Sequence, residues 1–258
     1  MIDPGHPPPP PEPPPPGGVY GGPPRPPGAA AVPSLPWEDL GRHGFFPALF
    51  ETIKVLVASP SEAFRRAKER GDYFSPLLFA FLMIVVGTVF AALWALVAAA
   101  IFPPPDLSPF EDMLPPNVWP LFEFLVDTSP AGIAYRSLAS IPLYLVGLFL
   151  DTVVVHLFLV LVRGTATSKA GFGGSFRPAC YATVSALAML LPLVGQLVAI
   201  VWYLILLILG LAALHRTSHG KAAAAVLLPI VLCCVCFALL VVLAGVLGAG
   251  VLSGLSRN

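Results

Sequence analysis

Charged side chains are scarce in this sequence, and neither sign is in excess. Only 11% of its 258 residues are charged, against about 25% in soluble domains, and 57% are hydrophobic. Fourteen Lys and Arg residues balance fourteen Asp and Glu residues, so the net charge of zero gives no electrostatic case for nucleic-acid binding. The scarcity of charge excludes an ordinary soluble domain and indicates a chain whose solvent is the lipid bilayer.

Cysteines and the common catalytic motifs are also scarce. The four cysteines lie in apolar runs without metal-site spacing, so they are expected to pack inside the protein: Cys180, Cys233, Cys234 and Cys236. No G-x-S-x-G nucleophile elbow, H-E-x-x-H zinc motif or G-x-x-x-x-G-K-[ST] phosphate loop is present. The sequence therefore predicts no catalytic, cofactor or metal site, and no enzyme.

Residues 1–36 are dominated by proline and glycine, with a run from Pro7 to Pro16 that is broken only by Glu12. Such a segment buries too little apolar surface to offset its ordering entropy, which predicts a disordered tail with polyproline II character. The tail shows no apolar stretch of about 7–15 residues after a basic start, so no cleavable signal peptide is expected. Two interpretations stay open, a ligand for partner proteins that recognise proline-rich segments and a solvated cytoplasmic tail.

Residues 37–75 are expected to form short amphipathic helices at the membrane interface. Apolar residues recur at helical spacing from Phe45 to Val57, over a length too short to cross a bilayer. After it, Ser59 and Glu62 have the spacing of a capping box around Pro60, which predicts the start of a second short helix.

Four cations follow that start, just before the first long apolar run. They are Arg65, Arg66, Lys68 and Arg70. Cations beside a membrane span are attracted to anionic headgroups by about 1 kcal/mol each, so these four are the candidate anionic-lipid contact. A general cytoplasmic stop signal is the alternative, and the two interpretations are compatible.

Residues 76–250 are expected to form an all-α membrane domain with about five spans. The expected spans are 76–102, 137–162, 176–191, 193–214 and 222–248. A proline-rich acidic loop, 103–134, separates the first two spans, and Trp119 in it suits the interface. No polar loop separates the third span from the fourth. The pair is therefore either a tight hairpin or a re-entrant segment.

Lysines and arginines are distributed unequally between the two sides of this arrangement. Twelve lie before the first span, between spans two and three, or between spans four and five, whereas only Arg136 and Arg257 lie on the other side. The positive-inside rule then places the amino terminus in the cytoplasm and the carboxyl terminus outside.

Asp151 and His156 form the candidate intramembrane polar site. Asp151 is the one acid inside an expected span, and an ionised carboxylate there costs on the order of 3 kcal/mol, which raises the hypothesis of an ion or proton pathway. His156 lies about 140° from Asp151 around the helix, so the two do not share a face. Asp151 is alternatively protonated, or bonded to a polar residue of another span. The candidates for that bond are Tyr181, Ser185, Gln196 and Tyr203.

Small residues recur near the end of the fifth span. Ala244 and Gly248, and likewise Gly245 and Ala249, are four apart on neighbouring stripes, a spacing that permits close helix approach. The approach is either within one chain or between two, which leaves a homo-oligomer open.

Several ordered motifs resemble the Ypt-interacting-protein (Yip) domain family. The resemblance extends over about Trp37 to Val231. Its motifs are Phe50-Glu51-Thr52, Ser59 to Phe64, Pro76 to Ala80, Gly173 to Tyr181, Pro192 to Gly195, Trp202, and Gly210 to His219 followed by Lys221-Ala222. The composition and proline-rich tail resemble the bacterial branch. The resemblance implies a five-span, non-enzymatic protein of the bacterial inner membrane with a cytosolic amino terminus and no cofactor.

Two functional hypotheses follow. The first is a non-enzymatic membrane protein that organises partner proteins or lipids, with its tail and basic helices at the cytoplasmic surface. The alternative is a small transporter or channel that uses Asp151 near the midplane. The Rab-type GTPase binding of eukaryotic Yip relatives requires partners that bacteria lack, so we expect the fold to carry over rather than that role.

Overall fold

The computed structural model describes residues 34–69, 71–104, 106–108, 113–166 and 168–255, all within one compact unit. Most of the proline-rich segment, residues 1–33, lies outside the described residues, as does Arg70. Every regular element that the structure describes is helical. In order these are η1 (Pro36–Asp39), α1 (Leu40–His43), α2 (Phe45–Ala58), α3 (Pro60–Arg66), α4 (Phe74–Ile101), α6 (Trp119–Val126), α7 (Pro130–Leu161), α8 (Gly173–Ala182), η2 (Thr183–Leu190), α9 (Gly195–Leu214) and α10 (His219–Leu255).

The short helices α2 and α3 form where the apolar spacing and Pro60 predict them. One face of α2 is buried against the protein through Ala48, Thr52 and Leu56. Its other face leaves Phe46 and Phe50 exposed, at 68% and 65%. Helix α2 is therefore apolar on two sides, one packed on the protein and one unpacked.

The capping box expected at the start of α3 does not form. The Ser59 side chain accepts no capping hydrogen bond, and the Glu62 carboxylate pairs instead with Arg65 and with Arg66 one turn later. Two charge-assisted bonds to guanidinium groups are stronger than one bond to a neutral backbone N–H, so the arginines compete successfully for Glu62. Pro60 still begins the helix, because its fixed φ suits the first position.

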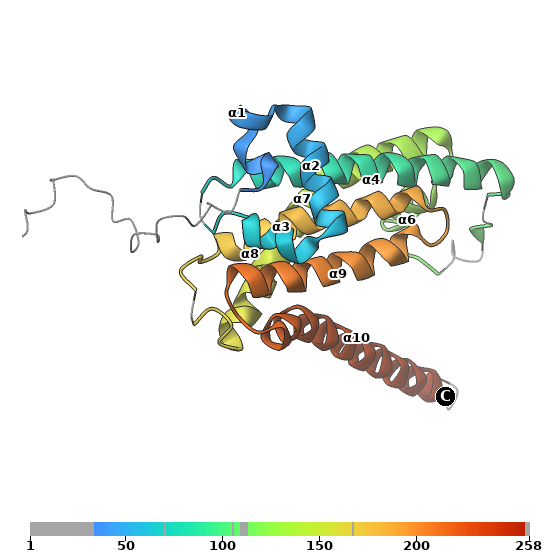
Figure 1. The fold of residues 1–258 in the computed structure, drawn as a ribbon. Helices are drawn as coiled ribbons and strands as arrows, with labels where there is room; N and C mark the ends of the chain where they lie inside the picture. Colours follow the sequence, from blue (N-terminus) through green and yellow to red (C-terminus); the bar gives the residue numbers. More distant parts are fainter. Residues whose placement is uncertain (1–33, 70, 105, 109–112, 167, 256–258) are drawn as a thin grey trace, which may run out of the picture. The chain divides into compact units, whose positions relative to one another are not determined.

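Four helices are long and apolar enough to cross a membrane, namely α4, α7, α9 and the His219–Leu243 part of α10. Figure 1 shows α4, α7 and α9 running along the bundle, with α2 and α3 across one end and α10 diverging from it. Helix α7 begins at Pro130 rather than near residue 137, because the Ser129 side chain accepts from the Gly132 N–H and caps it. Helix α6 lies in the loop that precedes it.

The residues expected as the third span form α8 and the 3-10 helix η2, which lie at the centre of the bundle. They pack against α4 on one side and α9 on the other. The run is antiparallel to α9: a Cβ on Gly174 would meet His215 at one end, and a Cβ on Gly195 would meet Ala188 at the other. Both the hairpin and the re-entrant alternative require this antiparallel arrangement.

The 3-10 geometry of η2 explains how α8 and η2 together match the length of α9. The ten residues of α8 rise about 15 Å at 1.5 Å per residue, and the eight of η2 rise about 16 Å at 2.0 Å per residue. Their sum of about 31 Å equals the roughly 30 Å of the 20-residue α9.

The core lies where α3, α8 and α9 meet. Gly210 of α9 permits this approach, because a Cβ at Gly210 would come within 2.6 Å of Pro178 and 2.9 Å of Phe64. Both neighbours are buried, Phe64 almost completely. A larger side chain at Gly210 would separate three helices at once.

Helix α10 packs against α7 and α9 only near its start, through Ala222, Ala225 and Val226. Three cysteines expected in the core, Cys233, Cys234 and Cys236, are exposed on it, whereas Cys180 is buried in α8. The expectation failed because an apolar run does not say whether a helix faces protein or lipid. The small residues near its end lie mostly outside the described side chains; at Gly245 an added Cβ would meet nothing within 4 Å.

Candidate functional sites

A buried ion pair joins the amino-terminal segment to the helical bundle. Arg177 of α8 donates from Nη1 to Oε1 of Glu38 in η1 at 2.6 Å, and both side chains are at most 2% exposed. Tyr181 Oη donates to the same oxygen at 3.0 Å, and the Lys68 backbone N–H donates to Oε2 at 2.7 Å. Arg177 Nη2 also donates to the Asp72 carbonyl at 2.7 Å. The carboxylate and the guanidinium are thus bonded on several sides, as a buried pair requires.

Burial dominates the electrostatics of this pair. It raises the pKa of Glu38 above 4.5, although the Lys68 N–H and the Arg177 charge oppose the shift. Removing Arg177 would leave the carboxyl in the same dry position without its cation. The ion pair therefore holds η1 against α8, and removal of either side chain leaves the other charge buried alone.

Trp37 is a second anchor next to the ion pair. Its backbone N–H donates to Thr52 Oγ1 at 3.0 Å, and its indole N–H donates to the Ser75 carbonyl at 2.7 Å. Its ring packs edge-on against Phe45 and Phe79, with centroids 5.2 and 5.9 Å away. Trp37 is completely buried, so it ties η1 to both α2 and α4.

The four candidate lipid-contact cations have different surroundings. Arg65 has a 69% exposed side chain paired with Glu62, whereas Arg66 is 29% exposed and bonded to the same residue at 2.9 Å. Lys68 Nζ donates to the Glu38 carbonyl at 2.7 Å. Arg70 lies outside the described residues. Arg65 and Lys68 are therefore exposed cations, whereas Arg66 is partly buried.

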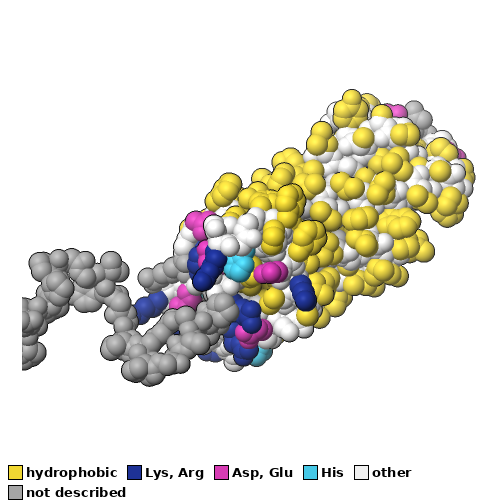
Figure 2. Space-filling view, turned by 45° about the horizontal axis from the view of Figure 1, so that its top comes forward, with side chains coloured by type: hydrophobic (Ala, Val, Ile, Leu, Met, Phe, Trp, Pro, Cys, Tyr) yellow, Lys and Arg dark blue, Asp and Glu magenta, His cyan; other side chains and the backbone are white. Residues whose placement is uncertain are grey.

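Charged side chains gather at one end of the bundle, here called the charged end. Figure 2 shows Lys, Arg, Asp and Glu mostly at that end of the visible face, and hydrophobic side chains over much of the remainder. Contacts bring the segments after α7 and α9 to this end. Lys221 Nζ donates to the Arg163 carbonyl at 3.3 Å, and Arg216 pairs with Glu69 beyond α3. The charged end thus combines three segments that are distant in sequence.

His156 does not meet Asp151, in agreement with their different faces of α7. Its Nδ1 lies 2.9 Å from Ser175 Oγ, which lies 2.9 Å from His215 Nε2. The hydroxyl therefore links two imidazoles from α7 and from the end of α9. His215 Nδ1 is buried without a partner among the described residues, and burial together with the nearby His156 lowers the pKa of His215 to about 4.

Asp151 lines a groove on the other part of the bundle. Helices α7 and α9 form its walls, and α4 and η2 complete it, around a volume of about 630 Å³. Tyr203 Oη of α9 donates to Asp151 Oδ2 at 3.0 Å and so bridges the two walls. Of the four partners that the sequence offered for Asp151, Tyr203 makes the bond.

The groove mixes small apolar side chains with polar ones. Its polar lining residues are Thr88, Arg136, Ser137, Ser140, Tyr144, Asp151, Thr183, Ser185, Gln196 and Tyr203. Arg136 is separated from Asp151 by about 22 Å along α7 and donates to the Leu125 carbonyl. The groove thus extends along much of the helical bundle.

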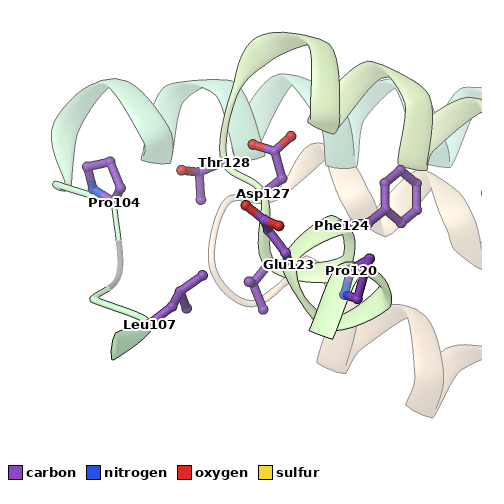
Figure 3. A pocket seen from close by; sticks show the side chains of 8 residues that line it. Pro104, Leu107, Pro120, Glu123, Phe124, Asp127 and Thr128 are labelled. Carbon is purple, nitrogen blue, oxygen red and sulfur yellow. The ribbon is translucent and has the colours of Figure 1, made fainter. Parts of the chain in front are cut away.

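A smaller hollow of about 460 Å³ lies in the loop between α4 and α7. Figure 3 shows Glu123 and Asp127 on its wall, near Pro120 and Thr128. The Asp127 carboxylate already accepts from the Ser129 N–H and hydroxyl, at 2.8 and 2.9 Å. These bonds assign Asp127 to holding the turn before α7. Among the described residues, no group of three or more His, Cys, Asp or Glu side chains is placed to hold a metal ion.

Sequence reasoning missed the Glu38 and Arg177 pair and the two imidazoles at Ser175. Arg177 was counted as one of the cytoplasmic cations, although its side chain is 1% exposed. A signal was present in the sequence, because an arginine next to Pro178 inside an apolar helical run needs a buried anion. No pattern identified Glu38, which lies 139 residues away, as that anion.

Comparison with known families supplies one further finding. A model of the Yip1 domain matches residues 53–249, which is most of the chain. No curated protein and no solved structure matches significantly.

Proposed function

Because this chain belongs to the Yip1 domain family, whose members are generally non-enzymatic membrane proteins, we propose that it organises partner proteins or lipids at the cytoplasmic face of a membrane. The chain is a multi-pass membrane protein. Its spans hold the protein in the membrane, and its charged end is the surface that contacts the partner proteins or lipids.

The fixed attachment of the segment 34–73 to the bundle is the observation that carries this proposal. Glu38 and Trp37 attach this segment through an ion pair and through bonds to α2 and α4. This segment, here called the platform, has exposed side chains at Phe46, Phe50 and Arg65. Exposed aromatic side chains and an exposed cation both suit the interface of an anionic membrane. The proline-rich tail supplies the partner-binding part of the proposal.

We further propose a five-span arrangement, with α8 and η2 as the third span. The support is their combined rise of about 31 Å alongside α9, which is close to the hydrocarbon thickness of about 30 Å. The lysine and arginine distribution supports an amino terminus in the cytoplasm and a carboxyl terminus outside as part of this proposal. We assign the chain to the inner membrane of a bacterium, and a second copy along the exposed α10 is part of the proposal.

Single reporter cysteines test the arrangement, in a background without the four native cysteines. Ala166→Cys, Leu193→Cys and Met113→Cys report three segments of which Leu193 and Met113 are largely exposed. A membrane-impermeant maleimide is expected to reach Ala166→Cys from the cytoplasmic side, and the other two from the opposite side. Labelling of Leu193→Cys together with Ala166→Cys would show a re-entrant segment instead.

The organising role is tested by removing parts of the surface without opening the buried contacts. One variant lacks residues 1–33 and keeps Glu38, and the other carries Phe46→Ser, Phe50→Ser and Arg65→Gln. The first is expected to lose co-purifying proteins, and the second to lose enrichment of anionic lipid in mass spectra of the purified protein. A control with Val153→Ser and Leu157→Ser changes exposed apolar residues of α7 only. Partner and lipid profiles that match the intact protein in both test variants would refute the proposal.

A second candidate function is a small transporter or channel. The observation in its favour is the groove that contains Asp151 and Tyr203 between apolar walls. It predicts proton or solute flux in proteoliposomes that Asp151→Asn abolishes. Flux that is unchanged in this variant would remove Asp151 from the mechanism.

A further inference from the structure

The groove between α7 and α9 leaves hydrogen-bonding capacity unused at membrane depth. The Asp151 carboxylate accepts one bond, from Tyr203 at 3.0 Å, among the described residues. A carboxylate offers about four acceptor positions, so most of its capacity remains. Ser185 of η2 lines the same groove and is only 4% exposed, and its side chain forms no hydrogen bond with a residue that the structure describes. The groove therefore contains two polar side chains, Asp151 and Ser185, whose hydrogen-bonding capacity is available to a ligand.

The depth of Asp151 restricts what that partner is. Asp151 lies ten residues before Leu161, about 15 Å from the end of α7 at the charged end. Lipid headgroups stay at the interface, so the ammonium of a phospholipid does not reach this carboxylate. A partner must carry its positive charge into the apolar region on its own hydrophobic body.

The rest of the lining suits such a body. The groove of about 630 Å³ falls within the common range for small-molecule sites, about 300–1,000 Å³. Small residues on two walls, including Ala92 and Gly147, leave room for an apolar ligand, and a Cβ added at Gly147 would meet nothing within 4 Å. The aromatic rings of Tyr144 and Tyr203 line the same space, and such rings attract organic cations.

We propose that this groove binds a compact hydrophobic molecule that carries a protonated amine. The ammonium group donates hydrogen bonds to the Asp151 carboxylate, next to Tyr203, and neutralises its charge. The apolar body fills the space lined by α4 and α7. This inference goes beyond the organising role and does not depend on it. It uses the same residues as the transporter candidate but requires binding alone.

Three probes of equal shape test the inference, namely aminoadamantane, adamantanol and adamantane carboxylate. The full chain is placed in phosphatidylcholine nanodiscs, and saturable binding of radiolabelled aminoadamantane is measured against protein-free nanodiscs. We expect the unlabelled amine to compete, and the alcohol and the carboxylate to compete about tenfold or more weakly, because neither brings a cation to Asp151. Addition of phosphatidylethanolamine is expected to leave binding unchanged, because its headgroup stays at the interface.

Two variants with matched controls complete the design. Asp151→Asn is expected to weaken amine binding about tenfold or more, whereas Asp106→Asn in the distant loop leaves it unchanged. Ala92→Phe fills the groove and is expected to abolish binding, whereas Ala100→Phe places the same ring on an exposed part of α4 outside the groove. Elution of each variant at the position of the intact protein in size-exclusion chromatography verifies folding.

The results against the inference are equally definite. Binding that does not saturate, equal competition by the alcohol or the carboxylate, or displacement by phosphatidylethanolamine would each overturn it. So would full amine binding by both Asp151→Asn and Ala92→Phe. Failure of this test leaves the partner and lipid profiles of the tail and platform variants unaffected, so the two proposals fail separately.

Discussion

The Glu38–Arg177 pair at the charged end and the Asp151 groove satisfy their polar side chains in opposite ways. At the charged end, the Glu38 carboxylate accepts from three donors and Arg177 bonds to a carboxylate and a carbonyl. In the groove, Asp151 accepts one bond and Ser185 none among the described residues. Buried groups with complete bonding hold a structure in place, whereas incomplete bonding leaves capacity for a ligand. We therefore assign the Glu38–Arg177 pair to stabilising the fold and the groove to binding a ligand.

Removal of the Arg177 guanidinium should cause the largest loss of unfolding free energy. Arg177→Gln leaves Glu38 buried without its cation, which is expected to lower the unfolding free energy by about 3–5 kcal/mol. Unfolding in detergent micelles titrated with a denaturing detergent measures the loss. The control Arg216→Gln alters an exposed pair with Glu69 and should cost about 1 kcal/mol or less.

A double variant sharpens this result. Glu38→Gln combined with Arg177→Gln should recover part of the loss, because no charge is then buried alone. Equal losses for Arg177→Gln and Arg216→Gln would show that the burial of the pair does not matter.

Acid should weaken the charged end through His215. Its pKa is lowered from 6.5 to about 4, so the folded protein disfavours the proton that the unfolded chain accepts. The free energy of unfolding is therefore unaffected by His215 above pH 6.5, and it falls by about 3 kcal/mol as the pH drops toward 4. Unfolding free energies across this interval should fall less steeply in His215→Phe than in the intact protein. His219→Phe, at an exposed position, should keep the steep fall.

Changes in the groove should have the smallest effect on stability. Tyr203→Phe removes one hydrogen bond between helices, which is worth about 0.6 kcal/mol on average in a membrane. The same unfolding measurement should place it far below Arg177→Gln. A loss above about 3 kcal/mol would mean that the groove supports the fold as much as the charged end does.

The sequence predicts features that depend on local patterns. Apolar length located the four long helices, and helical spacing located α2 and the separation of Asp151 from His156. Polar residue type narrowed the partner of Asp151 to four candidates that included Tyr203. Each of these inferences needs only nearby residues or a short list.

Long-range pairings were beyond that reasoning. Glu38 meets Arg177 across 139 residues, and Ser175 meets His215 across 40, because α8 is enclosed by its neighbours. Hydropathy gives no preference between such partners. It also gave no sign of 3-10 geometry in η2, or that three cysteines of α10 face outward, because both depend on what the helix packs against.

The geometry of η2 has a consequence for tolerance to insertion. Its eight residues cover about 16 Å, a distance for which an α-helix needs ten or eleven. Two or three residues added within η2 would therefore fit between the same end points if the segment adopted α-helical geometry. An equal insertion in α9 has no such reserve and would lengthen that helix by about 3–5 Å. Length variation among related chains should accordingly concentrate in the segment that corresponds to η2.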